Sequence, residues 1–289
     1  MRRVGHALVV LLAACSSAAK QPAGPPEDQT LMRHEQAGKI AYGLDRPDEA
    51  VVQFEAALKQ AYARDDLQAI SDLSFSLAVA QLRANQPQDA LTTTQQARAE
   101  LVRRGSQPFP SLLLAEATAL YRLGNGKDAD SLATEIEGSG DADAAAGASF
   151  LRGLIADEAG NETQLRDAAA RLSGAAAPLR VADRLELEAR LALRQGNPDA
   201  AREAAMQAAG IRQEALDYRG MARALAVAGL ATERAGEREL AADLYLRAGR
   251  SAAAQADAET ARPWLQHALD LTNNTATAEA ARTALSDLK

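Results

Sequence analysis

Aromatic residues are scarce in this chain of 289 residues: they make up 3% of it, although 47% of the residues are hydrophobic. Alanine supplies much of that hydrophobic share, and it is the best helix former because it loses no side-chain entropy in a helix. Small side chains let helices approach closely, but each buries little area. The composition therefore predicts an all-α protein whose core extends along many close contacts.

A second cysteine and an excess of basic residues are also missing. With one cysteine, the chain cannot form an internal disulfide. It has 32 basic and 39 acidic residues, which give a formal net charge of −7. Proteins that bind nucleic acids need a basic face to contact phosphates. We therefore expect no nucleic acid among the partners.

The sequence shows no constellation of residues that would support catalysis or metal binding. The three histidines, His6, His34 and His267, are scattered, and none has the second histidine of a zinc-protease helix. The glycine-rich stretches 124–127 and 138–140 follow no strand pattern and complete no phosphate-binding loop. Acidic residues are spread over the expected helices and are interpreted as solvated faces. We therefore expect no enzyme, no metal and no dissociable cofactor.

The N-terminus carries a short apolar run, residues 4–12, behind the basic pair Arg2 and Arg3. A permanent membrane-spanning helix needs about 20 apolar residues, so this run is too short. It ends in Leu12-Ala13-Ala14-Cys15, which resembles the lipobox of bacterial lipoprotein signal peptides. The resemblance implies that residues 1–14 are cleaved and that Cys15 carries covalent lipid, whose several acyl chains give stable anchoring. The alternative is an ordinary secretory signal with a chance cysteine.

The residues after the lipobox predict where the folded part sits. Ser16 follows Cys15, whereas an aspartate at that place commonly signals inner-membrane retention, so the resemblance implies the periplasmic face of the outer membrane. Residues 15–29 contain Pro22, Pro25 and Pro26 without apolar periodicity, which is typical of a flexible tether. About 14 such residues have a root-mean-square reach of roughly 20 Å.

From there on, a polar turn followed by a helix with small residues recurs along the chain. The first copy, 43–58, has a turn with Pro47 and then Ala50, Phe54 and Ala57, and variants follow at 84–90, 124–129, 196–201 and 236–241. A unit that recurs at near-regular spacing indicates a repeat architecture. From Leu31 on, the chain resembles tetratricopeptide repeats. In these, a first helix, a tight turn and a second helix stack on their neighbours through small residues.

The resemblance implies an all-α helical-hairpin solenoid of about six repeats in residues 30–255, with a last partial repeat and a capping helix in 256–289. The spacing of 36 to 40 residues exceeds the family's repeat of about 34, so we expect a less regular superhelix. Residues 257–271 carry Ala261, Leu265 and Ala268 at the spacing of a second helix, and 277–288 should cover the end of the stack. Trp264 is interpreted as a packing residue there, with an exposed docking anchor as the alternative.

In tetratricopeptide arrays the first helix of each repeat lines an inner groove that binds partners. Transferred by position, the inward residues are Tyr42, Phe75, Arg83, Leu114, Tyr121, Arg122, Phe150, Leu154, Arg190, Arg194 and Arg234. Arginine beside an aromatic or aliphatic side chain suits a peptide groove, because arginine can bind carboxylates or stack on rings. The resemblance thus implies a protein partner.

Arginine recurs at the end of the first helix, and we call Arg83, Arg122, Arg194 and Arg234 the arginine row; Glu158 interrupts it. An interpretation that needs no ligand is that each arginine complements the dipole of its helix. The Lys and Asn set with which some family members bind a C-terminal carboxylate does not occur at the matching positions.

Together these patterns predict a membrane-anchored periplasmic scaffold or adaptor lipoprotein in cell-envelope assembly. Its protein partner would belong to pilus or secretin assembly, outer-membrane biogenesis or peptidoglycan synthesis, and the lipid would hold it at the membrane. The alternative is a lipoprotein that binds a glycan or a small ligand, which would favour clustered inward aromatic residues. A spacer without a partner is a further alternative.

Overall fold

The computed structural model describes residues 28–288, and this part of the chain contains fourteen α-helices and no strand. The predicted signal peptide, Cys15 and nearly all of the tether lie outside the described residues. The helices are α1 (Gln29–Gly43), α2 (Pro47–Ala63), α3 (Leu67–Arg83), α4 (Pro87–Arg103), α5 (Pro110–Arg122), α6 (Gly126–Glu137), α7 (Ala142–Glu158), α8 (Glu162–Arg171), α9 (Pro178–Arg194), α10 (Pro198–Glu214), α11 (Tyr218–Arg234), α12 (Arg238–Ala254), α13 (Ala258–Leu271) and α14 (Thr275–Ser286).

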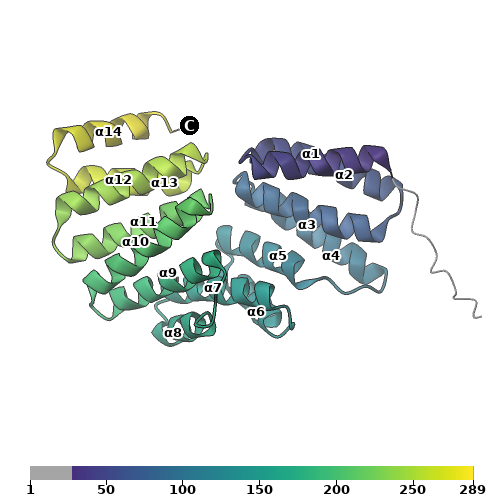
Figure 1. Cartoon of the computed structure of the whole chain (residues 1–289), viewed down its shortest axis with the longest axis horizontal. Helices are drawn as coiled ribbons and strands as arrows, with labels where there is room; N and C mark the ends of the chain where they lie inside the picture. Colours follow the sequence, from purple (N-terminus) through teal and green to yellow (C-terminus); the bar gives the residue numbers. More distant parts are fainter. Residues whose placement is uncertain (1–27, 289) are drawn as a thin grey trace, which may run out of the picture.

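The helices pair in chain order into hairpins that stack side by side, with each odd-numbered helix first and each even-numbered helix second (Figure 1). This arrangement confirms the all-α helical-hairpin solenoid. At the C-terminal end, α13 is the first helix and α14 the second helix of a seventh hairpin, whereas the spacing in 257–271 suggested a second helix. Both kinds of helix carry small residues where they cross, so this spacing does not distinguish them.

The turn after each first helix from α1 to α11 contains one residue with a positive φ angle, which residues other than glycine rarely adopt. Glycine serves after α5, α7, α9 and α11, whereas Asp45 and Asn85 serve after α1 and α3. Turns after two second helices use Leu216 and Ala256 instead, with φ angles of 58° and 55°. Three of the repeated polar turns begin with a glycine, Gly124, Gly196 and Gly236, and the structure gives each of these the positive φ angle.

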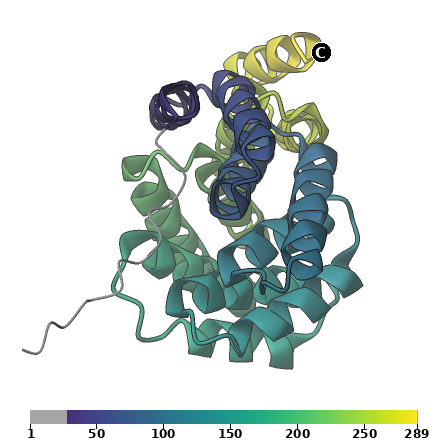
Figure 2. The ribbon, with the colours of Figure 1, turned by 90° about the vertical axis from the view of Figure 1, so that its right-hand side faces the viewer.

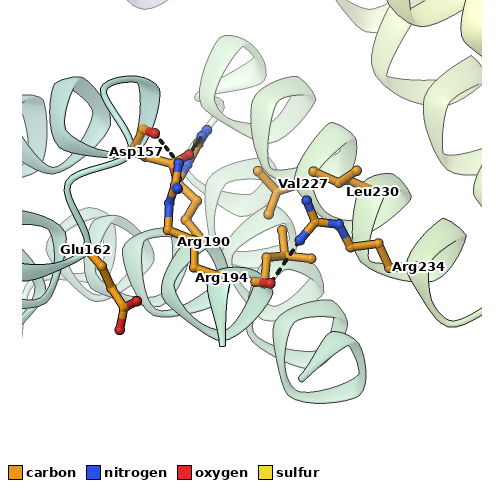
Figure 3. A pocket seen from close by; sticks show the side chains of 9 residues that line it. Asp157, Glu162, Arg190, Arg194, Val227, Leu230 and Arg234 are labelled. Atoms are coloured by element: carbon orange, nitrogen blue, oxygen red, sulfur yellow. Dashed lines mark hydrogen bonds and ion pairs between the residues drawn. The ribbon is translucent and has the colours of Figure 1, made fainter. Parts of the chain in front are cut away.

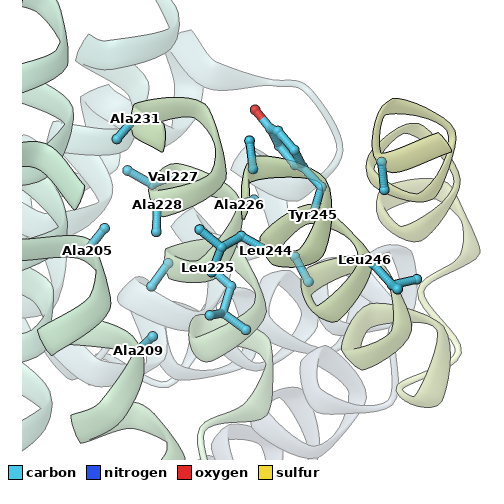
Figure 4. Close-up of a cluster of buried hydrophobic side chains, with 14 of the residues drawn as sticks. Ala205, Ala209, Leu225, Ala226, Val227, Ala228, Ala231, Leu244, Tyr245 and Leu246 are labelled. Carbon is cyan, nitrogen blue, oxygen red and sulfur yellow. The ribbon is translucent and has the colours of Figure 1, made fainter. Parts of the chain in front are cut away.

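Small residues allow the hairpins to pack closely. The buried hydrophobic residues of α9 to α14 form one continuous cluster, in which Tyr245 is the main aromatic side chain (Figure 4). A Cβ atom added to Gly249 on α12 would lie 2.6 Å from Cγ of Leu265 on α13, so only glycine fits there without a shift. Trp264 packs against the same cluster, as the packing interpretation expected. Five smaller clusters occupy the stack from α1 to α9.

The solenoid curves so far that its first hairpins touch its last ones. Arg83 Nη2 donates to the carbonyl oxygen of Leu216 at 3.2 Å, and Asn85 Nδ2 donates to that of Ala256 at 3.3 Å. Figure 1 shows the ends of α1 and α3 facing those of α11 to α13, and Figure 2 views the array from the side of the first hairpins. The sequence did not predict this contact.

None of the helices between residues 28 and 288 is both long and apolar enough to cross a membrane.

Candidate partner-binding site

The arginine row contacts the preceding hairpin along the ends of the first helices. Arg122 Nη1 donates to the carbonyl oxygen of Leu82 at 2.5 Å, and Arg234 Nη1 donates to that of Leu193 at 2.8 Å. Leu82 and Leu193 are the last residues but one of α3 and α9. Each of these two carbonyl groups also accepts a backbone N–H of the following turn, from Asn85 and from Gly196 at 3.3 Å, so the arginine adds a second donor at the end of the helix.

Arg194 and Arg83, the other two members of the row, also contact the preceding hairpin. Arg194 Nε donates to Asp157 Oδ1 at 2.7 Å, and its Nη2 donates to the carbonyl oxygen of the same residue. Arg83 lies over the ring of Tyr42, 4.8 Å from its centroid, and its Nε donates to Asp45 at 2.9 Å. The ligand-free interpretation, in which each arginine complements the dipole of its own helix, stays a prediction.

Two successive pairs of first helices are joined by polar residues that do not belong to the arginine row. Tyr121 donates its hydroxyl to Glu158 Oε1 at 2.5 Å, which joins the end of α5 to the end of α7. His267 Nε2 lies 2.8 Å from Glu233 Oε2 and joins α13 to α11. A polar contact therefore links every first helix, from α1 to α13, to the next one.

Three of the predicted arginines come together in a pocket of about 430 Å³ at the ends of α7, α9 and α11 (Figure 3). The pocket is lined by Asp157, Gly160, Glu162, Arg190, Leu193, Arg194, Val227, Leu230 and Arg234. Val227 and Leu230 form an apolar wall beside the Arg234 guanidinium. The pocket thus combines positive charge with aliphatic surface, as the sequence analysis expected of a peptide site.

The three arginines of the pocket differ in how far their charge is neutralised. Arg190 Nη1 donates to Asp157 Oδ2 at 2.8 Å, and Arg194 donates to the other oxygen of the same carboxylate. Arg234 is exposed, and among the described residues its one hydrogen bond is to a neutral carbonyl group. Arg234 is therefore the cation of this pocket with the greatest remaining capacity for an anion.

Below the pocket lies a buried charge cluster that the sequence analysis missed. Glu186 on α9 has a fully buried side chain and accepts hydrogen bonds from Arg190 at 3.0 Å, Arg212 at 3.1 Å and Arg223 at 2.6 Å. Burial raises the pKa of this carboxyl, but the three arginines lower it more, so that its pKa is about 2. Arg212 also donates to buried Asp183 at 2.8 Å. The interpretation of the acidic residues as solvated faces is wrong for these two.

The remaining predicted groove residues take part in packing between hairpins. The guanidinium carbons of Arg212 and Arg223 lie 5.4 and 5.3 Å from the centroid of the Phe150 ring. Phe75 makes an edge-to-face contact with Phe109, with centroids 5.5 Å apart. Leu154 is buried in the cluster of α7, α8 and α9. These contacts position the site, whereas their predicted role in partner binding stays a prediction.

Two other predicted inward residues also lie at hairpin contacts. Leu114 on α5 packs against α7 at Gly147, where an added Cβ would lie 2.5 Å from Leu114 Cδ2. Tyr121 packs against two neighbouring clusters in addition to its hydrogen bond. Within residues 28–288, no group of three or more His, Cys, Asp or Glu side chains is placed to hold a metal ion.

Comparisons with known proteins agree with the fold. No family model matches the sequence, and no curated protein matches it. The structure is similar to the crystal structure of a tetratricopeptide repeat protein from Parabacteroides merdae, with a TM-score of 0.50 and 17% identity over 90% of this chain and 99% of that one. A complex of the TPR2AB domain of yeast Sti1 with pHSP90 gives a TM-score of 0.34 and 14% identity over 89% of this chain and 98% of that one. The likeness to the Parabacteroides merdae protein shows the fold, a tetratricopeptide-type solenoid.

Proposed function

We propose that the protein is a lipid-anchored scaffold that binds a protein partner at the arginine pocket of α7, α9 and α11. The observation that carries this proposal is the exposed guanidinium of Arg234. Among residues 28–288 it has one hydrogen bond, to a neutral carbonyl group, and it lies beside Val227 and Leu230. A segment with a carboxylate next to an aliphatic side chain matches both features, because arginine presents two parallel donors to a carboxylate.

The pocket alone would bind such a segment weakly. An exposed ion pair contributes at most about 1 kcal/mol, because water and salt screen it. Burial of aliphatic surface against Val227 and Leu230 would add about 25 cal/mol per Å². We therefore propose that the affinity comes from several contacts, of which the pair with Arg234 fixes the orientation of the partner.

The lipid anchor is the second part of the proposal, and it rests on the lipobox that ends in Cys15. Acylation would confine the scaffold to the membrane surface, and we propose the periplasmic face of the outer membrane. Confinement raises the effective concentration of whatever the scaffold binds. A role in cell-envelope assembly follows from that location.

Photo-crosslinking in the native host tests the pocket. A photoreactive amino acid at Leu230 should give one dominant protein adduct, which mass spectrometry identifies. The same probe at Leu240, an exposed position on α12 outside the pocket, is the matched control. Arg234→Glu should abolish the adduct at Leu230, because it replaces the cation with a repelling charge. Glycan adducts would favour the ligand-binding alternative, and no adduct above the control would contradict partner binding there.

Fractionation tests the anchor separately. Cys15→Ala should leave the chain uncleaved at the lipobox or release it from the membrane fraction. Ser17→Ala, two residues further on, is the matched control and should remain lipidated. Unchanged lipidation of the Cys15→Ala variant would refute the anchor and leave the pocket proposal intact.

A further inference from the structure

The outer side of α1, at the N-terminal end of the solenoid, exposes large apolar side chains. Met32, Ile40 and Leu44 are 48%, 53% and 61% exposed. They lie at multiples of four residues, a spacing that places side chains along one side of a helix. Helix α1 packs on α2, and none of the described helices covers its outer side (Figure 1). We call this side the N-terminal face; it consists of Met32, Arg33, Gln36, Lys39, Ile40 and the turn residue Leu44.

Helix α14, at the other end of the solenoid, differs from α1. Its exposed residues are small or polar: Thr275, Ala276, Glu279, Arg282, Thr283 and Ser286. The ends of a solenoid require a polar outer face for solubility, and α14 meets this requirement. The N-terminal face does not, so we expect another surface to cover it in the working protein.

The proposed lipid anchor determines which surface the N-terminal face meets first. Cys15 precedes Asp28 by 13 positions, and α1 begins at Gln29. A flexible segment of that length has a root-mean-square reach of about 20 Å. An acylated Cys15 would therefore hold α1 close to the bilayer, whereas the other helices are connected to the anchor only through α1. Tethering raises the effective concentration of the bilayer surface at this face.

The charges of the N-terminal face suit a bilayer that contains anionic lipids. The exposed residues of α1 include Arg33 and Lys39 and no acidic residue, although the chain as a whole has a net charge of −7. Glu35 on the same helix is half-buried and pairs with Lys39 at 2.5 Å. Arginine and lysine near a bilayer are attracted to anionic headgroups, and their aliphatic parts can lie along apolar surface.

A second copy of the chain fits this face less well. In a symmetric pair the same surface patch meets itself. Arg33 and Lys39 would then lie against the same cations of the other copy, and the exposed part of α1 offers no acidic side chain to neutralise them. The charges therefore favour a lipid surface as the occupant.

We propose that the N-terminal face lies on the bilayer surface, with Met32, Ile40 and Leu44 at the boundary between headgroups and acyl chains and Arg33 and Lys39 against anionic headgroups. The proposal rests on the proposed lipid anchor, because three apolar side chains bury too little area to hold the protein at a membrane alone. The anchor and the face together would fix the orientation of the solenoid on the membrane. The arginine pocket of α7, α9 and α11 does not belong to this face.

Fluorescence from a probe on α1 tests this proposal. The chain without the predicted signal, residues 15–289, is coupled through Cys15 to a maleimide lipid in vesicles of equal parts phosphatidylcholine and phosphatidylglycerol. A polarity-sensitive fluorescent amino acid at Gln36 should shift its emission to the blue, and the shift should be smaller on phosphatidylcholine alone. The same probe at Ala170, an exposed position on α8, is the matched control and should not shift. Figure 1 shows α8 on the side of the array opposite α1.

Substitutions separate the apolar from the charged contribution. Met32→Ser with Ile40→Ser should abolish the blue shift at Gln36. Arg33→Glu with Lys39→Glu should reduce it on the vesicles with phosphatidylglycerol. The matched control for this charge change is Arg166→Glu with Arg171→Glu on α8, which should leave the shift intact; Arg166, like Lys39, pairs with a glutamate four residues before it. All six positions are exposed, and circular dichroism checks that the variants remain helical.

The outcomes decide between the bilayer and the other occupants. No shift at Gln36, an equal shift at Ala170, or a shift that survives Met32→Ser with Ile40→Ser overturns the proposal. A shift that appears without vesicles and grows with protein concentration overturns it in favour of a second copy. The maleimide coupling needs no native acylation, so failure of this face is distinguishable from failure of the anchor in the Cys15→Ala fractionation and from failure of the crosslink at Leu230.

Discussion

The N-terminal and C-terminal parts of the solenoid differ in how their buried hydrophobic residues cluster. From α9 to α14 the buried hydrophobic residues form one cluster, and alanine supplies most of its fully buried positions. From α1 to α9 they form five clusters. Buried polar residues such as Gln81, Thr94 and Glu116 lie in that N-terminal region, and Glu116 Oε2 has no hydrogen-bond partner. The C-terminal region also buries polar side chains, among them Asp183, Arg212 and Thr232, so buried polar groups alone do not account for the difference between the regions.

This difference in clustering implies that the hairpins of the array need not all unfold in one cooperative step. Stability in such arrays is approximately a sum over repeats and the interfaces between neighbours. The second helices α6 and α8 have 12 and 10 residues, against 17 in α10 and α12, so the middle hairpins offer less interface. We therefore expect the C-terminal hairpins to unfold together and the N-terminal ones to open in smaller units.

The largest effect is expected where the two regions meet, at Glu186. Glu186→Ala leaves Arg190, Arg212 and Arg223 without their shared carboxylate, and removing one partner of a buried ion pair costs about 3–5 kcal/mol. Urea unfolding at neutral pH measures this loss. Glu188→Ala on the same helix is the matched control, because its pair with Arg184 is at the surface and contributes at most about 1 kcal/mol. Equal losses in both variants would contradict the structural role of Glu186.

The same residue predicts a pH dependence with a definite sign. Its pKa in the folded protein is about 2, below the value of about 4.3 for an unperturbed glutamate. The unfolded chain therefore binds a proton first as the pH falls. The stabilisation is complete above about pH 4.3 and is lost as the pH falls toward 2. The difference in unfolding free energy between the unsubstituted protein and Glu186→Gln should shrink over that range.

One leucine-to-alanine substitution in each region, with a smaller expected effect, compares the clusters directly. Leu265 and Leu112 are both fully buried, the first in the continuous cluster and the second in a small one with Ala97 and Leu101. Truncation of either to alanine should cost about 2–5 kcal/mol. Hydrogen exchange should differ in extent: Leu265→Ala should speed exchange from α9 to α14, and Leu112→Ala only in α4 and α5. Exchange confined to α12 and α13 in the Leu265→Ala variant would remove the contrast between the regions.

The smallest effect concerns the turn at Leu216, which has a positive φ angle of 58°. Leu216→Gly should raise the unfolding free energy by about 0.5–1 kcal/mol, because glycine adopts this conformation without strain although it gains entropy when unfolded. Gly236→Ala, at an equivalent angle of 86° after α11, should lower it. Thermal unfolding of the two variants measures whether each substitution raises or lowers the unfolding free energy. A loss of stability in Leu216→Gly would show that the contacts of the Leu216 side chain contribute more to stability than its backbone strain costs.

Much of the fold could be predicted, because it depends on local sequence features that recur in each repeat. The turn residues from Asp45 to Gly236 and the small residues at helix crossings are visible within one repeat. The row of arginines was visible as well, but its acceptors were not, because Leu82 lies 40 residues before Arg122. Such a partner depends on how neighbouring hairpins dock.

The pocket and the contact between the ends of the solenoid were predictable to different degrees. Arg190, Arg194 and Arg234 were predicted as inward residues, and the structure brings them together. The burial of Glu186 was missed, since a glutamate four residues before an arginine on a helix is equally typical of a surface pair. The contact of Arg83 and Asn85 with the turns at Leu216 and Ala256 depends on the curvature summed over several hairpins, to which each irregular spacing contributes.

The length of the first helices sets a scale for any molecule that lies along them. Helices α3, α7, α9 and α11 each have 17 residues, which at about 1.5 Å per residue makes the wall of the solenoid roughly 25 Å wide. An extended chain covers about 3.3 Å per residue, so about eight residues cross that wall. A shorter peptide reaches one rim, whereas a segment of that length can contact the Arg234 pocket and the opposite rim at the same time.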